Sequence, residues 1–441
     1  MPTTDQRGAL KALSGLGSDM MIRIFLILYM LTGFMPRLDA RPDTRHFPLP
    51  ASLESRVRFW VDVYTRYSAT QYLVFDEAHP ERIFRVCDLK AGFPDGVPSR
   101  KEKEVFLKAE RDKTISTLVR LAEKKSAGGI PDAEELRLAR LFPDSVRPEQ
   151  LLLAAQRIRL QHGGLESFYE GLVRSGRYMD SLRILFKRRE LPEELAYLPH
   201  VESSFNIRAV SPAGAVGLWQ FIPSTGGRYL RIDIAVDERK DPYDSGEAAA
   251  RLLKLHFDSL GSWPLAITAY NYGLAGIRRI VRETGTKDLA ELISRVQKKA
   301  FGFSTKNFYA EFIAAAIVAE NPKAFFPDFA AEPPWRFKIV ECPIDLPMNA
   351  VIRAFNLSDS VFAEWNPSLT AAVHKGHRPI PKGFHLRIPE GADETAAFEV
   401  LASEKIIPKG SYWAWCTHPG RLFHFVDKTY FYFPARKGKA G

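Results

Sequence analysis

Apolar residues recur at helical spacing over most of the chain, and proline or glycine separates these stretches. This period is typical of amphipathic helices. Ser99, with Glu102 three positions later, forms a capping-box signature at the start of the first long stretch. The pattern predicts helices over residues 99–125, 131–142, 148–161 and 165–188, and then a run of helices with short turns from about 192 to 321.

Capping side chains and prolines divide the 192–321 run further. Pro264 suits the first turn of a helix, where its missing N–H costs little. Asn321 precedes Pro322 and ends the run, because a residue before proline disfavours the helical conformation. The expected helix starts are Asp244 or Ser245, Ser262 and Thr305, and the expected ends are Leu260 and Glu320.

Other segments have the shorter period of strands. Residues 72–75 and 82–86, on either side of Asp-Glu-Ala-His-Pro, predict a β-hairpin. Residues 57–67 alternate aromatic and charged side chains, which fits a helix or a strand. After a linker at 330–334, we expect strands at 335–340 and 386–389 and helices at 346–355 and 359–365.

The composition is that of a folded protein, with 441 residues and 46% hydrophobic side chains, enough for two or three domains. Lys and Arg number 62 against 52 Asp and Glu. This excess favours anionic partners, such as cell-wall carboxylates or an anionic membrane surface. No zinc-finger or RRM-type motif supports a nucleic-acid partner. We expect no metal or organic cofactor, since His374, His377 and His385 match no strong zinc-ligand spacing.

The N-terminal residues 1–40 have the pattern of an export signal. An apolar run at 22–35 lies behind Lys11 and Arg23, and Ala40 offers a small residue for cleavage. The run is short for a membrane span, so an uncleaved anchor is the alternative. The cysteines lie far apart in sequence, and we expect independent thiols at Cys87, Cys342 and Cys416.

Glu202 lies near the predicted end of a helix, beside an apolar stripe. The stripe consists of Leu195, Leu198, Val201 and Phe205. Gly214 and Gly217 follow and can take positive φ or let another chain lie close. Trp219 and Gln220 then offer an aromatic ring for stacking and an amide. Burial disfavours the charged form of a carboxyl, so such a glutamate can act as an acid on a sugar–sugar bond.

Several motifs occur here in a fixed order. They are Glu202-Ser203, Ser211, Gly217-Leu-Trp-Gln220-Phe221, Ala269-Tyr-Asn271 and Asn307-Phe-Tyr309. Together they resemble the signatures of soluble-type lytic murein transglycosylase domains, most of all the membrane-bound lytic transglycosylase D-like branch. The resemblance covers roughly residues 190–325. It implies a lysozyme-like helical domain related to goose-type lysozyme, and a fold that is mainly α, or α+β overall.

The resemblance also implies an activity on peptidoglycan. These enzymes cleave the β-1,4 bond between N-acetylmuramic acid and N-acetylglucosamine and leave a 1,6-anhydro end. By that analogy Glu202 acts first as acid and then as base, with the substrate's acetamido group stabilising the intermediate charge. Such a route needs one carboxylate where most glycosidases use two. The implied partner is a glycan strand, and the implied location is the periplasm, with membrane association if the N-terminal segment stays uncleaved.

Substrate-binding roles are carried over by the same resemblance. Ser211 matches the serine beside the acetamido group, and Gln220 matches the amide of the cleft. Tyr270 matches the tyrosine that orients the catalytic glutamate. The full predicted set is Glu202 as catalytic residue and Ser203, Ser211, Gln220, Tyr270, Asn271 and Tyr309 as substrate-binding residues.

Structural interpretations stand beside these roles. Glu202 alone could be a structural acid, and Trp219 and Phe221 could belong to the core. The acidic segment with Asp233, Asp237, Glu238, Asp241 and Asp244 could supply a second catalytic carboxylate. We favour capping and ion pairs with Arg239 and Lys240 for these acids.

The C-terminal module at 335–390 weakly resembles a degenerate LysM-like glycan-binding unit through Asn366-Pro-Ser-Leu369 and Ile380-Pro-Lys-Gly383. Its opening lacks the usual Gly-Asp-Thr turn, so packing against the catalytic domain is at least an equal expectation. The predicted organisation is signal or anchor 1–40, helical extension 41–190, catalytic domain 191–325, module 335–390 and tail 400–441. Two alternatives to the transglycosylase remain open: a goose-type-lysozyme-like hydrolase and a non-catalytic wall-binding protein.

Overall fold

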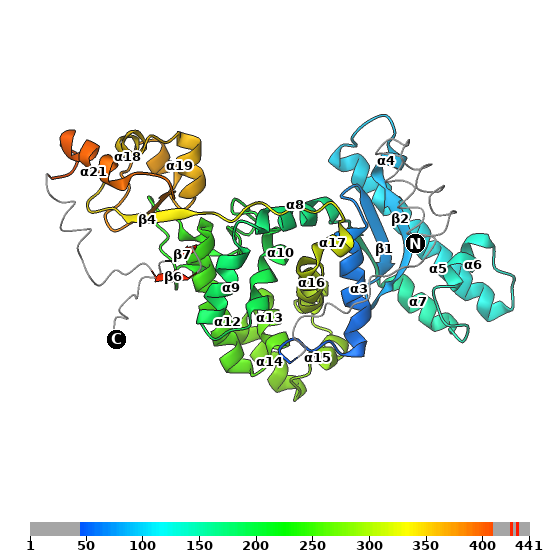
Figure 1. The fold of residues 1–441 in the computed structure, drawn as a ribbon. Helices are drawn as coiled ribbons and strands as arrows, with labels where there is room; N and C mark the ends of the chain where they lie inside the picture. Colours follow the sequence, from blue (N-terminus) through cyan, green and yellow to red (C-terminus); the bar gives the residue numbers. More distant parts are fainter. Residues whose placement is uncertain (1–44, 409–423, 427–428, 432–441) are drawn as a thin grey trace, which may run out of the picture. The chain divides into compact units, whose positions relative to one another are not determined.

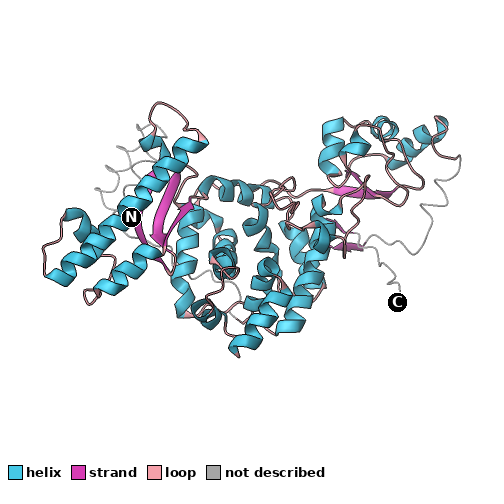
Figure 2. Cartoon of the chain, turned by 180° about the vertical axis from the view of Figure 1, so that it is seen from behind, coloured by secondary structure: helices cyan, strands magenta, loops and turns pink. Residues whose placement is uncertain are grey.

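Helices dominate the part of the chain that the structure describes. The computed structural model describes residues 45–408, 424–426 and 429–431. Within the described residues, the strands form one three-stranded sheet and two two-stranded sheets. They are drawn as magenta arrows in Figure 2. The prediction of a mainly α fold is confirmed.

The sheet near the N-terminal end combines neighbouring and distant segments. Strands β1 (Gln71–Asp76) and β2 (His79–Asp88) form the predicted antiparallel hairpin. Strand β3 (Ile158–His162) pairs antiparallel with the other edge of β1, which gives the order β2-β1-β3. Helix α3 (Ala51–Thr65) precedes the sheet, so the 57–67 segment is a helix.

The predicted helix over 148–161 is wrong in its last third. Helix α7 (Pro148–Gln156) ends early, and β3 begins at Ile158. From Ile158 to Gln161 apolar and polar residues alternate, and the open edge of β1 supplies hydrogen-bond partners that a helix would not use. Pairing with the open edge of β1 therefore makes this segment a strand and not a helix.

Helix α5 (Arg100–Ala127) confirms the capping-box prediction, because Ser99 and Glu102 each bond the other's backbone N–H. The predicted 165–188 helix is two helices, α8 (Leu165–Ser175) and α9 (Met179–Arg188). Between them, a Cβ on Gly176 would lie 2.1 Å from the carbonyl oxygen of Glu332, so the break lets a distant segment approach. The short helices α4 (Leu89–Gly92) and α6 (Ala133–Ala139) complete this region.

Helix α16 (Phe303–Glu320) is the central helix of the following region. It contacts α3, α10 (Leu198–Ser203) and α13 (Trp263–Tyr272), which surround it in Figure 1. The other elements are η1 (Glu193–Tyr197), α11 (Pro223–Gly226), η2 (Glu238–Lys240), α12 (Pro242–Leu260), α14 (Leu274–Thr284), α15 (Leu289–Arg295) and α17 (Pro322–Phe325).

Two predicted helix starts are wrong, although both helices exist. Helix α12 is capped by Asp241, whose carboxylate accepts from the N–H groups of Tyr243 and Asp244, and neither Asp244 nor Ser245 is the cap. Helix α16 begins at Phe303, so Thr305 lies inside its first turn. The predicted ends at Leu260 and Glu320 are confirmed.

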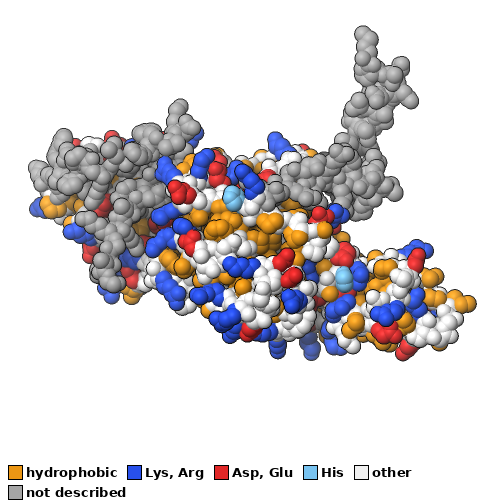
Figure 3. Space-filling view, turned by 90° about the horizontal axis from the view of Figure 1, so that it is seen from below, with side chains coloured by type: hydrophobic (Ala, Val, Ile, Leu, Met, Phe, Trp, Pro, Cys, Tyr) orange, Lys and Arg blue, Asp and Glu red, His pale blue; other side chains and the backbone are white. Residues whose placement is uncertain are grey.

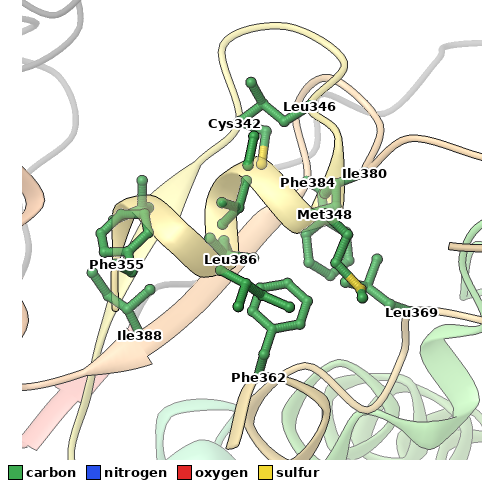
Figure 4. Close-up of a cluster of buried hydrophobic side chains, with 14 of the residues drawn as sticks. Cys342, Leu346, Met348, Phe355, Phe362, Leu369, Ile380, Phe384, Leu386 and Ile388 are labelled. Atoms are coloured by element: carbon green, nitrogen blue, oxygen red, sulfur yellow. The ribbon is translucent and has the colours of Figure 1, made fainter. Parts of the chain in front are cut away.

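The C-terminal module has its own apolar core, part of which Figure 4 shows around Phe362, Ile380 and Leu386. Its strands β4 and β5 pair antiparallel, and the expected helices lie between them. The elements are β4 (Phe337–Glu341), α18 (Met348–Ala354), α19 (Asp359–Trp365), α20 (Ala371–His374), β5 (His385–Pro389) and α21 (Glu394–Ser403), with β6 (His424–Val426) and β7 (Thr429–Phe431) beyond.

The module packs on the acidic segment before α12. The N–H of Asp237 donates to the carbonyl of Ser368 at 2.7 Å, and the N–H of Thr370 donates to the carbonyl of Ala235 at 3.0 Å. The buried guanidinium of Arg387 pairs with the buried carboxylate of Asp241. These contacts support the packing role, while glycan binding by this module stays a prediction.

Positive charge is not gathered into one stripe on the face drawn in Figure 3, where Lys and Arg alternate with acidic and apolar side chains. None of the helices in the described part of the chain has the length and apolar character that a bilayer crossing needs. Cys87 and Cys342 are buried free thiols. Cys416 and the predicted signal lie outside the described residues.

Candidate active site

Glu202 lies on the last turn of α10, a short helix with Pro199 near its start. The chain reverses directly after it, because Ser204 and Phe205 have φ values of 49° and 53°. Leu195, Leu198 and Phe205 are at most 1% exposed, so the predicted apolar stripe anchors the helix in the core. The half-buried Glu202 side chain lies on the other side and opens into a cavity.

The cavity has a volume of about 290 Å³, close to the lower end for ligand sites. It brings together five elements that are far apart in the sequence: α3, β3, α10, α13 and α16. Its lining residues are Trp60, Arg159, Leu160, Gln161, Val201, Glu202, Asn271, Phe303, Ser304, Phe308 and Glu311. Aromatic rings and polar side chains both contribute to this wall, a mixture that is common in ligand sites.

Burial raises the pKa of Glu202 to about 8. No hydrogen bond or ion pair within the described residues involves its carboxyl, so nothing offsets the cost of desolvating the charge. The group therefore holds its proton at neutral pH. This agrees with the expectation that burial keeps Glu202 in its acid form.

Trp219 does not provide the stacking ring in the groove. The side chain is 0% exposed, and its ring packs 5.7 Å from that of Phe186 on α9. Phe221 is buried as well, so the core interpretation holds for both residues. The aromatic walls of the cavity come instead from Trp60, Phe303 and Phe308.

The glycines after Glu202 have the predicted conformations. Gly214 and Gly217 have φ values of 77° and 80°. A Cβ on Gly217 would lie 2.0 Å from the carbonyl oxygen of Arg239. The buried Arg239 donates to the carbonyls of Gly214 and Phe221 and pairs with Asp237. These contacts hold the loop in place.

Ser203 and Ser211 hold this loop in place. The hydroxyl of Ser203 donates to the carbonyl of Leu218 at 2.9 Å and ties α10 to the loop. The hydroxyl oxygen of Ser211 accepts from the N–H of Ala215 at 3.0 Å and closes a turn. Neither serine is among the residues that line the cavity.

Gln220 and Tyr270 lie around the same loop. The Gln220 amide donates to the carbonyl of Gly217 at 2.9 Å, and its backbone has a φ of 47°. The hydroxyl of Tyr270 donates to the carbonyl of Trp219 at 2.7 Å. Burial, and then the charge of Glu202, raise the pKa of Tyr270, so its hydroxyl stays protonated close to the catalytic candidate.

Asn271 and Tyr309 have opposite placements. Asn271 lines the cavity, and its side-chain oxygen accepts from the hydroxyl of Thr305 at 3.0 Å. Tyr309 is 1% exposed, and its hydroxyl donates to the carbonyl of Pro48 at 2.9 Å. Tyr309 does not line the cavity. Its hydrogen bond to Pro48 is a structural contact.

The lining residues missing from the sequence prediction include Trp60, Arg159, Gln161 and Glu311. The first three belong to α3 and β3, outside the region of resemblance, and no local signal distinguishes them. Glu311 did carry a signal, because it is a lone charge in an apolar stretch of helix. Burial, and then the charge of Glu202, raise its pKa to about 8.

The acidic segment before α12 is engaged elsewhere. Asp237 pairs with Arg239, Asp241 pairs with Arg387 and caps α12, and Glu238 accepts from the N–H of Arg231. None of these carboxylates lines the cavity. The favoured interpretation of capping and ion pairs therefore fits this segment better than a second catalytic acid does.

Comparison with known proteins matches the part of the site that holds Glu202 and Asn271. The family model described as "Transglycosylase SLT domain" matches residues 184–293. The "Membrane-bound lytic murein transglycosylase D" of Escherichia coli is 32% identical over 157 residues, which are 35% of this chain and 34% of that protein. The chain thus spans about a third of the length of this relative.

Two further matches differ in coverage. The "Putative tributyltin chloride resistance protein" of an Alteromonas species is 31% identical over 163 residues, which are 36% of this chain and 76% of that protein. Among solved structures, the 70 kDa soluble lytic transglycosylase of Escherichia coli matches with 14% identity and a TM-score of 0.29, over 64% of this chain and 53% of that one.

Proposed function

Because this chain belongs to the transglycosylase SLT domain family, we propose that it is a peptidoglycan lytic transglycosylase. The substrate bond is the β-1,4 link between N-acetylmuramic acid and N-acetylglucosamine, and the product is a 1,6-anhydro-muramic end. The observation that carries the proposal is the carboxyl of Glu202, which opens into an aromatic-lined cavity and is protonated at neutral pH.

In the first step the protonated carboxyl of Glu202 donates its proton to the glycosidic oxygen. The bond from that oxygen to the anomeric carbon breaks, and N-acetylglucosamine leaves with the new hydroxyl. The acetamido oxygen of the substrate attacks the anomeric carbon and takes up the positive charge. Glu202 is now a carboxylate, and the nearby Tyr270 hydroxyl, which donates to the Trp219 carbonyl, holds the loop around it in place.

In the second step the Glu202 carboxylate removes the proton of the muramic 6-hydroxyl. That oxygen attacks the anomeric carbon and displaces the acetamido oxygen, which closes the anhydro ring. Glu202 ends protonated, no water is consumed, and one carboxyl serves both steps.

The substrate implies the location. Peptidoglycan lies outside the cytoplasmic membrane, so the proposed site of action is the periplasm after export through the N-terminal segment. The curated relatives named membrane-bound support a position at the cell envelope.

Substitution of Glu202 tests the proposal. Glu202→Gln keeps the shape and removes the proton, and we expect release of muropeptides from purified sacculi to fall at least about a thousandfold. Mass spectrometry should detect products one water lighter than reducing ends. With a pKa of about 8, the required acid form is lost as pH rises through 8, so wild-type activity should fall on the alkaline side.

Two results would contradict the proposal. Reducing ends as the main product would assign the chain to the goose-type-lysozyme-like hydrolases. Sacculus binding without any release by the wild type would leave a non-catalytic wall-binding protein.

A further inference from the structure

Glu311 interrupts the buried face of the central helix α16. Every residue from Phe308 to Val318 is buried except Glu311, whose half-buried side chain opens into the cavity. One turn earlier Phe308 lines the same cavity, so this face of α16 forms part of the wall of the cavity into which Glu202 opens. Burying a charged carboxyl here costs free energy unless it is paired with a cation or stays protonated.

No cation compensates this carboxyl. The hydrogen bonds and ion pairs recorded among the described residues include none to Glu311. Arg159 from β3 lines the cavity, but its guanidinium lies 4.4 Å over the Phe303 ring and 3.6 Å from the Glu77 carboxylate. The titratable groups that face the pair are Tyr64 of α3 and Tyr270 of α13, and burial raises the pKa of both, so neither supplies a positive charge.

Two carboxyls in one partly enclosed cavity cannot both ionise at low cost. The first proton to leave creates a negative charge that opposes loss of the second, so the two groups titrate as a pair. The negative charge of Glu202 raises the pKa of Glu311, and the effect is mutual because the repulsion belongs to both.

We propose that Glu311 is a positioning residue for the reaction, which shares the cavity with Glu202 and keeps that carboxyl in its acid form up to a higher pH. Glu311 exchanges no proton with substrate in this role. The inference rests on the proposed transglycosylase function. It explains why the buried stretch of α16 from Phe308 to Val318 holds an uncompensated carboxyl at the cavity.

The test is the pH profile of muropeptide release by purified full-length Glu311→Gln. Without the second charge, Glu202 should lose its proton earlier, and the alkaline limb of kcat/KM should move down by about one pH unit. At pH 6 and below, where Glu202 is protonated in both proteins, the ratio of the two rates should no longer change with pH. Glu320→Gln, the same change at the exposed end of α16, should leave the profile unchanged.

Three outcomes would overturn the inference while leaving the proposed function intact. The alkaline limb of the profile could stay in place, or the loss of rate could be equal at every pH. Alternatively, Glu311→Gln could lose minor reducing-end products that the wild type forms beside its anhydro products. The last would make Glu311 a base for water. If the wild type releases nothing or Glu202→Gln stays active, the proposed function itself fails.

A second measurement does not depend on the folding of Glu311→Gln. Carboxyl carbon NMR can follow Glu311 in the wild type and in Glu202→Gln, with assignment by selective labelling. We expect the titration midpoint of Glu311 to fall by about one pH unit when Glu202 is replaced. An unchanged midpoint would show that the two groups do not interact, which would end the inference.

Discussion

At the scale of single residues, the cavity shows how one apolar neighbourhood sets the chemistry of its carboxyls. Glu202 lacks recorded partners within the described residues, and burial raises its pKa to about 8. Residues around it hold the loop that faces it, and their hydroxyls mostly bond backbone carbonyls. The site therefore consists of a few side chains that open into the cavity and a loop that hydrogen bonds hold in place.

Tyr270 and Tyr309 allow a matched prediction at this scale. Each hydroxyl donates one hydrogen bond to a carbonyl, at 2.7 Å to Trp219 and 2.9 Å to Pro48. Tyr→Phe at either position should cost about 1 kcal/mol of unfolding free energy. Only Tyr270→Phe should also lower kcat, by about tenfold, because Tyr270 lies beside Glu202.

Denaturant unfolding and steady-state kinetics on both variants check this pair. Equal losses of kcat would mean that the two hydroxyls act through stability alone. A kcat loss confined to Tyr309→Phe would remove Tyr270 from the site.

At the scale of secondary structure, α3 and β3 complete the cavity into which Glu202 of α10, the proposed catalytic residue, opens. The family model begins at residue 184, after both elements. The β3 wall is possible because residues 158–161 pair with β1. The element that the sequence pattern misassigned is therefore one that shapes the cavity.

Arg159 on β3 gives a prediction for this wall. Its guanidinium is held over the Phe303 ring at the edge of the cavity, where it can meet an anionic group of the glycan strand. Arg159→Ala should raise KM for sacculi about fivefold, equivalent to about 1 kcal/mol, with kcat little changed. Arg58→Ala, a similarly exposed arginine on α3, is the control. Identical KM values for Arg159→Ala and wild type would exclude Arg159 from substrate binding.

The first residues of α12 and α16 could not be predicted from the sequence pattern. Asp241, Asp244 and Ser245 are all good caps in sequence, and only the start of α12 at Pro242 selects the first. Thr305 looks like a cap but turns inward to Asn271. Local patterns find the helix, and contacts between elements choose its first residue.

At the scale of the whole molecule, the C-terminal module is joined to the acidic segment before α12 by backbone bonds and one buried ion pair. Asp241 both caps α12 and pairs with Arg387 of the module. The Asp241 carboxylate thus caps α12 and also holds the C-terminal module against the segment before that helix.

Arg387→Ala should leave the Asp241 carboxylate buried without its cation and cost about 3–5 kcal/mol of unfolding free energy. The control is Arg353→Ala, which removes an exposed pair with Glu404 and should cost about 0–1 kcal/mol. Thermal unfolding of both variants measures the difference. Equal melting temperatures would show that the buried pair contributes nothing.

The sequence by itself determined the helical character, the hairpin, the glycine loop and the identity of Glu202 as the catalytic candidate. These follow from period, capping and motif order, which are local in the chain. Only the tertiary structure decided which groups face Glu202: it buried Trp219, turned Tyr309 to Pro48 and brought β3 and Glu311 to the cavity. The reason is physical, since burial and charge coupling depend on which distant segments pack together, and no local pattern encodes that packing.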